Sequence, residues 1–186
     1  GDDADWQHAP WTSDYVDIEG ELKPKPRFQT RTKMLWDDEN FYFYTYMEEP
    51  HVWAKLTQRD TVIFYDNEWE IFIDPDGDTY HYYEYEVNAF NTVWDLFLEK
   101  PYRDETIVLD VWNIEGLQSA VHVDGSINDP SDTDEGWGVE VAIPWAVLEE
   151  AAHKDSPPAP GDQWRVNFSR VEWQMDVVDG NYVKRI

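Results

Sequence analysis

Apolar and polar residues alternate with a period of two along most of the chain, which is the pattern of β-strands with one buried face. The clearest case is the segment 41–47, where Phe41, Phe43 and Met47 share one face and three tyrosines share the other. The preceding segment 27–36 is predicted to pair with it through the acidic turn 37–40. Further strands are expected at residues 68–73, 80–88, 92–98, 107–112, 118–123, 137–143 and 164–173.

Helical signals are scarce by comparison. Pro144 stands at a first-turn position, and residues 145–153 continue with Ala, Leu and Glu until the proline cluster at 156–161 ends the segment. Short strands with frequent turns and one short helix predict an all-β fold, an antiparallel β-sandwich of the immunoglobulin or jelly-roll type. The length of 186 residues and the lack of internal repeats predict one domain over residues 1–186.

The composition narrows the classes of partner. Lys and Arg number 14 while Asp and Glu number 40, so the formal charge of −26 repels phosphate backbones and anionic lipid headgroups. We therefore expect neither nucleic acid nor a membrane as a partner. A content of 11 Trp, 11 Tyr and 8 Phe excludes a disordered acidic tail, and the lack of cysteine excludes disulfides, zinc thiolate sites and thiol catalysis.

Several polar residues are predicted to share one face of a sheet. Side chains two apart lie on the same face of a strand, so segment 80–88 presents Glu84, Glu86 and Asn88 opposite its core face, and segment 68–73 presents Glu70. With Arg170 from a neighbouring strand, these groups would form a polar patch beside aromatic rings. Such a patch suits a neutral sugar, whose hydroxyls bond polar groups while its C–H face lies on a ring. Alternatively, each residue is an ordinary solvated residue of a half-exposed sheet.

Asp74, Asp76 and Asp78 place oxygen donors at alternate positions around Gly77, which is a local pattern that wraps Ca²⁺. It lacks the distal glutamate of an EF-hand loop, and a tight turn between strands explains the same residues. The acidic loop 128–135 has the same two interpretations. The five histidines lack the spacing of a metal site.

Five segments in order along the chain are similar to family 9 carbohydrate-binding modules and their stand-alone relatives. They are residues 34–42, 70–75, 83–89, 136–145 and 164–170, and Trp6, Ala9 and Trp11 resemble the opening motif of that family. The resemblance implies a β-sandwich, structural calcium, and a slot between two aromatic side chains that holds the terminal sugar of a β-glucan or xylan chain. It also implies that the chain begins just inside the first strand of the family, at Gly1, and stops before its C-terminal segment.

By position in the family, Glu70 and Asn88 match polar residues that contact the ligand, and Glu86 stands where the best-studied branch has an arginine. Phe64 or Tyr65 falls near the first aromatic platform, where a tryptophan is expected. The second platform lies in the family's C-terminal segment, so Trp94 or Trp173 would have to close the site unless a final segment is missing. The predicted sugar-contacting residues are Phe64, Tyr65, Glu70, Glu86, Asn88, Trp94, Arg170 and Trp173, and the predicted calcium ligands are Asp74, Asp76 and Asp78.

The sequence thus predicts non-catalytic binding of a plant or algal polysaccharide or oligosaccharide by a secreted, periplasmic or cell-surface protein, with a tethered glycoside hydrolase domain as a further partner. Two alternatives stay open. One is a haem-binding electron-transfer domain of the related sandwich superfamily, for which Met34, Met47 and Met175 are the available sulfur ligands. The other is a glycoside hydrolase in its own right, but 40 acidic residues single out no catalytic pair.

Overall fold

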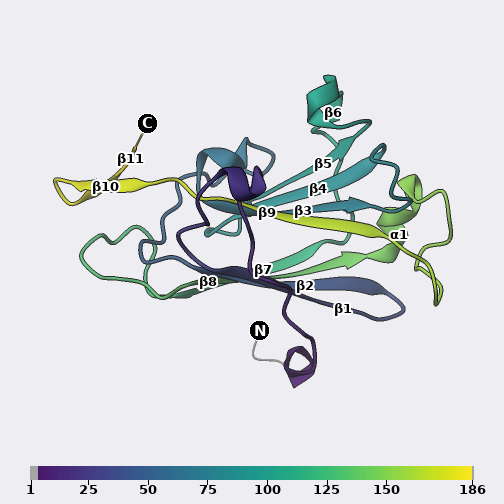
Figure 1. Ribbon diagram of the computed structural model, residues 1–186, viewed down its shortest axis with the longest axis horizontal. Helices are drawn as coiled ribbons and strands as arrows, with labels where there is room; N and C mark the ends of the chain where they lie inside the picture. The colour runs from purple at the N-terminus through teal and green to yellow at the C-terminus, as the bar shows by residue number, and fades with distance from the viewer. Residues whose placement is uncertain (1–3, 186) are drawn as a thin grey trace.

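The computed structural model describes residues 4–185, and two antiparallel sheets face each other in it (Figure 1). Gly1 lies outside the described residues. One sheet contains, from edge to edge, β1 (Thr30–Trp36), β2 (Asn40–Glu48), β8 (Gly136–Pro144) and β7 (Gln118–Asp124). The other contains β6 (Val108–Leu109), β5 (Val93–Leu98), β4 (Tyr82–Asn88), β3 (Glu68–Asp74) and β9 (Arg165–Val171).

The remaining elements lie at the ends and edges of the two layers. A separate hairpin of β10 (Met175–Val178) and β11 (Asn181–Lys184) projects from one end, and the short helix α1 (Trp145–Leu148) lies toward the other end (Figure 1). Short 3₁₀ turns complete the described residues: η1 (Ala4–Gln7), η2 (Gly20–Leu22), η3 (Ile63–Tyr65), η4 (Tyr102–Asp104) and η5 (Glu149–Ala151). Within residues 4–185, every helix falls short of the length and apolar character that a bilayer span requires.

The predicted all-β sandwich with one short helix is confirmed, and a strand lies in each expected segment. The helix is shorter than expected, because α1 ends at Leu148 and continues only as the 3₁₀ turn η5. The hairpin β10–β11 was not predicted. The pair Asp179-Gly180 is itself a sequence signal for a two-residue hairpin turn. In the structure both residues have the positive φ that this turn requires.

The core lies between the two sheets and follows the predicted alternation. Phe43 and Met47 of β2 are fully buried, whereas the tyrosines between them are only partly buried. Trp69 of β3 and Trp137 of β8 fill the space between the layers from opposite sides. Of the methionines considered as haem ligands, Met47 belongs to this core and Met34 packs against it, while Met175 begins β10.

The outer face of β4, within the five-stranded sheet, is covered, which the sequence did not predict. All seven residues of β4 are buried, so this strand is shielded on both faces. The segment between β2 and β3 covers one end of the strand, since the amide of Asn88 donates to the carbonyl of Leu56 at 2.8 Å. At the other end, the Tyr102 hydroxyl of η4 donates to Glu84 at 2.5 Å. The expectation of solvated outward residues is therefore wrong for this strand.

Replacing Gly136 by Ala should destabilise the fold by about 2 to 3 kcal/mol, because an added Cβ overpacks the sheet at a backbone conformation that favours glycine. Gly136 has a φ of +155°, and its Cβ would lie 2.2 Å from the Met47 carbonyl oxygen of the paired strand. Gly180→Ala is the matched control, since Gly180 also has positive φ but nothing lies within 4 Å of its Cβ position. Urea denaturation of both variants measures the difference, and equal losses would contradict the proposed clash.

Candidate functional site

Four glutamates point outward from β3 and β4, the two adjoining strands at the middle of the five-stranded sheet. The strand register places Glu70 directly opposite Glu86 and Glu68 opposite Asn88, while Glu84 lies two residues before Glu86. The four side chains are almost wholly buried, with exposed fractions of 0% for Glu68, 8% for Glu70, 3% for Glu84 and 2% for Glu86. Opposed like charges destabilise a strand pair, so this arrangement needs a compensating partner.

These glutamates have few partners within residues 4–185. Glu84 accepts the hydroxyl proton of Tyr102, but neither oxygen of Glu68 receives a hydrogen bond from an N–H, a hydroxyl or a cation. One oxygen of Glu86 is buried without a partner in the same way, and no Lys or Arg forms an ion pair with this group in the described part of the chain. Buried polar groups in folded proteins are almost always paired, so these oxygens are exceptional.

The pKa values of Glu68, Glu84 and Glu86 are raised. Burial raises the pKa of Glu68 far above its ordinary range, and the charges of Glu86 and Glu70 add to the effect. Burial raises the pKa of Glu84 to about 9, although the hydrogen bond from Tyr102 opposes it. Burial likewise raises the pKa of Glu86 to about 8, with the charge of Glu70 acting in the same direction. The site therefore favours groups that donate hydrogen bonds or bring positive charge.

An aromatic cluster adjoins the glutamates. The rings of Phe64 and Trp94 lie 6.5 Å apart, and those of Phe64 and Tyr65 lie 5.0 Å apart. Trp94 of β5 is paired with Glu86, which places this ring beside the glutamates. Trp173 joins the cluster because its indole N–H donates to the Phe64 carbonyl at 2.9 Å. The indole nitrogen of Trp94, by contrast, is buried and has no hydrogen-bond partner within residues 4–185.

Lys184, at the end of the unpredicted hairpin, also belongs to this cluster. Its ammonium nitrogen lies 3.5 Å from the ring centroid of Trp173 and donates to the Tyr65 carbonyl at 2.8 Å. The cation thus holds Trp173 and Tyr65 together through a cation–π contact and a hydrogen bond. Sequence reasoning missed Lys184, because its position depends on the β10–β11 hairpin folding back toward η3.

A buried polar network holds the cluster over the sheet. One carboxylate oxygen of Asp66 accepts the backbone N–H groups of Lys55 and Leu56, both at 2.8 Å, and the Asn88 amide at 3.0 Å. The next residue, Asn67, accepts the backbone N–H of Trp173 at 2.7 Å. The short segment from η3 into β3 is therefore tied to its neighbours immediately after Phe64 and Tyr65. This network gives the exposed rings a defined position, which a binding surface needs.

The family of the chain follows from its sequence match. A family described as "Carbohydrate family 9 binding domain-like" matches residues 1–158, which is most of the chain. The chain belongs to this family. No curated protein matches the sequence.

Solved structures share the fold of this family 9 domain at low sequence identity. A candidate carbohydrate-binding protein from Bacteroides uniformis is 15% identical with a TM-score of 0.63, over 97% of this chain and 78% of the other. A family 9 module from Caldicellulosiruptor kristjanssonii in complex with cellotriose is 16% identical with a TM-score of 0.58, over 98% and 73%. The same kind of module in complex with glucose is 16% identical with a TM-score of 0.59, over 98% and 75%.

The fold of this family 9 domain corrects one predicted member of the polar patch. Arg170 does not share a face with Glu70 and Glu86, because it is paired with Trp69, whose side chain lies in the core between the sheets. Its guanidinium instead donates to Glu49 at 2.9 Å and to the Thr30 hydroxyl at 3.0 Å, and so bridges the two sheets. The prediction for Arg170 was wrong because alternation along one strand shows which residues share a face, but not how that strand is aligned with its neighbour.

Asn88 lies on the predicted face, but its amide is fully used within the chain. Its nitrogen donates to Leu56 and Asp66, and its oxygen accepts the backbone N–H groups of Phe90 and Thr92, both at 3.0 Å. A sugar would have to break one of these bonds to contact Asn88. We therefore assign Asn88 to the support of the site and not to its surface. The other predicted residues come together: Phe64, Tyr65, Glu70, Glu86, Trp94 and Trp173.

The three aspartates predicted as calcium ligands form a closed turn after β3. Their carboxylates approach one another within 4.8 Å, with Asp74 buried and Asp76 and Asp78 exposed. Asp74 accepts the backbone N–H groups of Gly77 at 2.8 Å and Thr79 at 2.9 Å, and Arg165 lies 3.6 Å from it. These contacts are those of a turn, and a calcium ion at this position stays a prediction.

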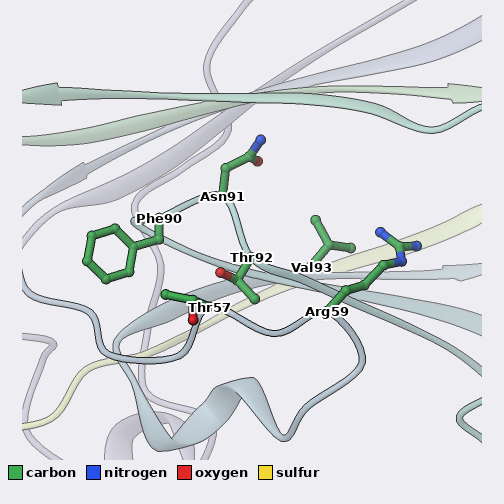
Figure 2. Close-up of a pocket in the computed structure, with 6 residues that line it drawn as sticks. All are labelled: Thr57, Arg59, Phe90, Asn91, Thr92 and Val93. Atoms are coloured by element: carbon green, nitrogen blue, oxygen red, sulfur yellow. The ribbon is translucent and has the colours of Figure 1, made fainter.

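A separate pocket of about 460 Å³ lies at the turn between β4 and β5, where Figure 2 shows its lining residues. Its polar groups already bond within the chain. Arg59 donates to the buried Asp95 at 2.5 Å, Thr92 donates to the Leu56 carbonyl at 2.8 Å, and Asn91 exchanges hydrogen bonds with Ser119. Since a ligand would find few free polar groups here, we place the candidate site at the aromatic cluster and the glutamates.

Proposed function

We propose that this family 9 domain binds a neutral oligosaccharide or polysaccharide at the aromatic cluster on the outer face of the five-stranded sheet. The observation that carries the proposal is the meeting of partly exposed rings with buried carboxylates that lack partners. A sugar presents C–H faces that pack on rings and hydroxyls that donate to carboxylates. The charge of −26 and the local glutamates disfavour uronic or sulfated chains.

The family supports this class of ligand, and the complexes of the Caldicellulosiruptor modules with cellotriose and glucose favour a β-glucan among neutral chains. Xylan is the other candidate. We assign Phe64, Tyr65, Trp94 and Trp173 to ring contacts and the carboxylates of Glu70 and Glu86 to polar recognition. We further propose a secreted or cell-surface protein that delivers a tethered glycoside hydrolase to its substrate.

The site has the character of a binding surface more than that of a hydrolase. Oxygens of Glu68, Glu70 and Glu86 lie within 4.8 Å of one another. Glycosidases hold their two carboxyl groups about 5 to 9.5 Å apart to admit the scissile bond or a water molecule. The glutamates are also almost wholly buried, which leaves no room for a scissile bond between two of them.

Replacing Phe64 or Trp94 by Ala is expected to weaken sugar binding by about tenfold each, because each change removes a ring contact worth about 1.4 kcal/mol. Trp36→Ala is the matched control, since Trp36 is 70% exposed but lies on β1 of the opposite sheet. Isothermal titration calorimetry with cello-, xylo-, manno- and laminari-oligosaccharides measures the affinities without relying on tryptophan fluorescence. An equal loss in Trp36→Ala, or no binding of any series by the wild type, would contradict the proposal.

A further inference from the structure

We propose that Glu68, Glu70 and Glu86 bind a divalent cation, calcium by preference, within the outer face of the five-stranded sheet. This site is distinct from the aspartate turn after β3. It shares Glu70 and Glu86 with the proposed sugar site, but it is argued from the spacing and burial of the three carboxyl groups and not from sugar binding. Each of the three glutamates offers one oxygen, and the three oxygens lie within 4.8 Å of one another.

This spacing fits a shared ion. Calcium binds oxygen ligands at about 2.3 to 2.6 Å, so two oxygens on the same ion lie at most about 5 Å apart. The glutamates thus need little rearrangement to close around calcium. Their positions follow from the sheet itself, because Glu70 and Glu86 are directly paired and Glu68 lies two residues before Glu70 on the same strand. Ligands from two paired strands are more firmly placed than ligands from a loop.

The state of Glu68 points independently to a positive ligand. Its side chain has an exposed fraction of 0%, and both of its oxygens lack a donor within residues 4–185. The groups that face it are Glu70 and Glu86, which are themselves acceptors when ionised. A buried carboxylate without any partner is costly, and a cation bound among the three would satisfy them together.

The burial of the oxygens favours calcium over magnesium. Both oxygens of Glu68 and one of Glu86 have no contact with solvent, so an ion there must shed the water on that side. Magnesium gives up water reluctantly, whereas calcium accepts irregular sets of carboxylate oxygens. The aspartate turn differs, because Asp74 already accepts two backbone N–H groups and adjoins Arg165. The competing explanation for the close, buried carboxyl groups is that they share protons and bind no cation.

Calorimetric titration of chelator-treated protein with Ca²⁺ and Mg²⁺, without sugar, tests the site. We compare the wild type with Glu68→Gln and Glu86→Gln, and with the double variant Asp76→Asn/Asp78→Asn as the matched control. Each glutamine variant is expected to weaken Ca²⁺ binding at least tenfold, since even the loss of a group outside the coordination sphere commonly costs about 10-fold to 100-fold. The aspartate double variant should keep the glutamate site, and Mg²⁺ should bind more weakly than Ca²⁺.

Thermal unfolding separates a cation from shared protons. With a cation, Ca²⁺ raises the Tm of the wild type and of the aspartate double variant but not that of Glu68→Gln. In chelator, Glu68→Gln should be at least as stable as the wild type, because an uncharged amide replaces a buried carboxyl group that has no cation to neutralise it. Unchanged Ca²⁺ binding in both glutamine variants, or a wild type that does not respond to Ca²⁺, would overturn the proposal. If Glu68→Gln fails to fold, Glu86→Gln alone provides the comparison. Calcium binding and Tm are measured without sugar, so a failure of the protein to bind sugar would not affect either result.

Discussion

Replacing Arg170 by Met is expected to lower the free energy of unfolding by about 3 to 5 kcal/mol, the usual cost of removing one partner from a buried ion pair. The side chains of Arg170 and Glu49 are each only 6% exposed, and their charged groups lie 2.9 Å apart between the two sheets. Burial lowers the pKa of Arg170 and raises that of Glu49, and the charge of each residue opposes the shift in the other. Without the guanidinium, the Glu49 carboxylate would be left buried with two uncharged donors, the Asn67 amide and the His51 backbone N–H.

Urea denaturation measures this loss of unfolding free energy, and two further variants show its cause. Arg185→Met removes the exposed ion pair with Asp176 and should change stability little, because water and salt screen that pair. The double variant Glu49→Leu/Arg170→Met should recover part of the loss, since no unpaired charge stays buried. A single Arg170→Met variant as stable as Arg185→Met would show that the bridge between the sheets contributes little.

Replacing Asp66 by Ala should also cost at least about 3 kcal/mol, because it removes a buried acceptor of three hydrogen bonds, each worth about 1.5 to 3 kcal/mol with a charged group and not fully additive. The N–H groups of Lys55 and Leu56 and the amide of Asn88 would lose their shared acceptor. Because this carboxylate follows directly on Phe64 and Tyr65, the aromatic cluster should lose its position as well. Sugar affinity and unfolding free energy are therefore expected to fall together.

Asp37→Ala is the control for this variant. Asp37 also accepts three hydrogen bonds, from the backbone N–H groups of Glu39 and Asn40 and from the Tyr42 hydroxyl, but it lies exposed in the β1–β2 turn. Water can replace its oxygens, so the loss of stability should be much smaller than for Asp66, and sugar binding should not change. Equal losses in both variants would mean that burial does not set the cost.

Local patterns predicted most of the fold because they arise from local physics. Alternation in 41–47 reports which side chains face the core, and this face was confirmed for Phe41, Phe43 and Met47. Turn residues separate the strands at nearly the observed places, and Pro144 precedes the short helix. The hairpin turn at Asp179 and Gly180 is equally local, because both residues have the positive φ that the turn requires.

Several features of the candidate site do not follow from such patterns. The aromatic members Phe64, Tyr65, Trp94 and Trp173 were predicted, but their meeting with Lys184 depends on contacts between distant segments. The side of the sheet that Arg170 faces depends on how its strand is aligned with β3. The alternation of residues within one strand does not determine this alignment. Asn88 faces outward as predicted, yet the segment between β2 and β3 occupies its amide.

The sequence by itself determined the strands, the two-layer architecture and the acidic, aromatic character of this family 9 domain, because period-two burial and turn chemistry act over a few residues. Only the tertiary structure decided that Glu68, Glu70 and Glu86 meet in a buried group, since pairing β3 with β4 aligns them and covering segments exclude water. The same carboxylates would be ordinary surface charges on an open sheet. Their chemistry comes from burial, which is a property of the whole fold and not of any one segment.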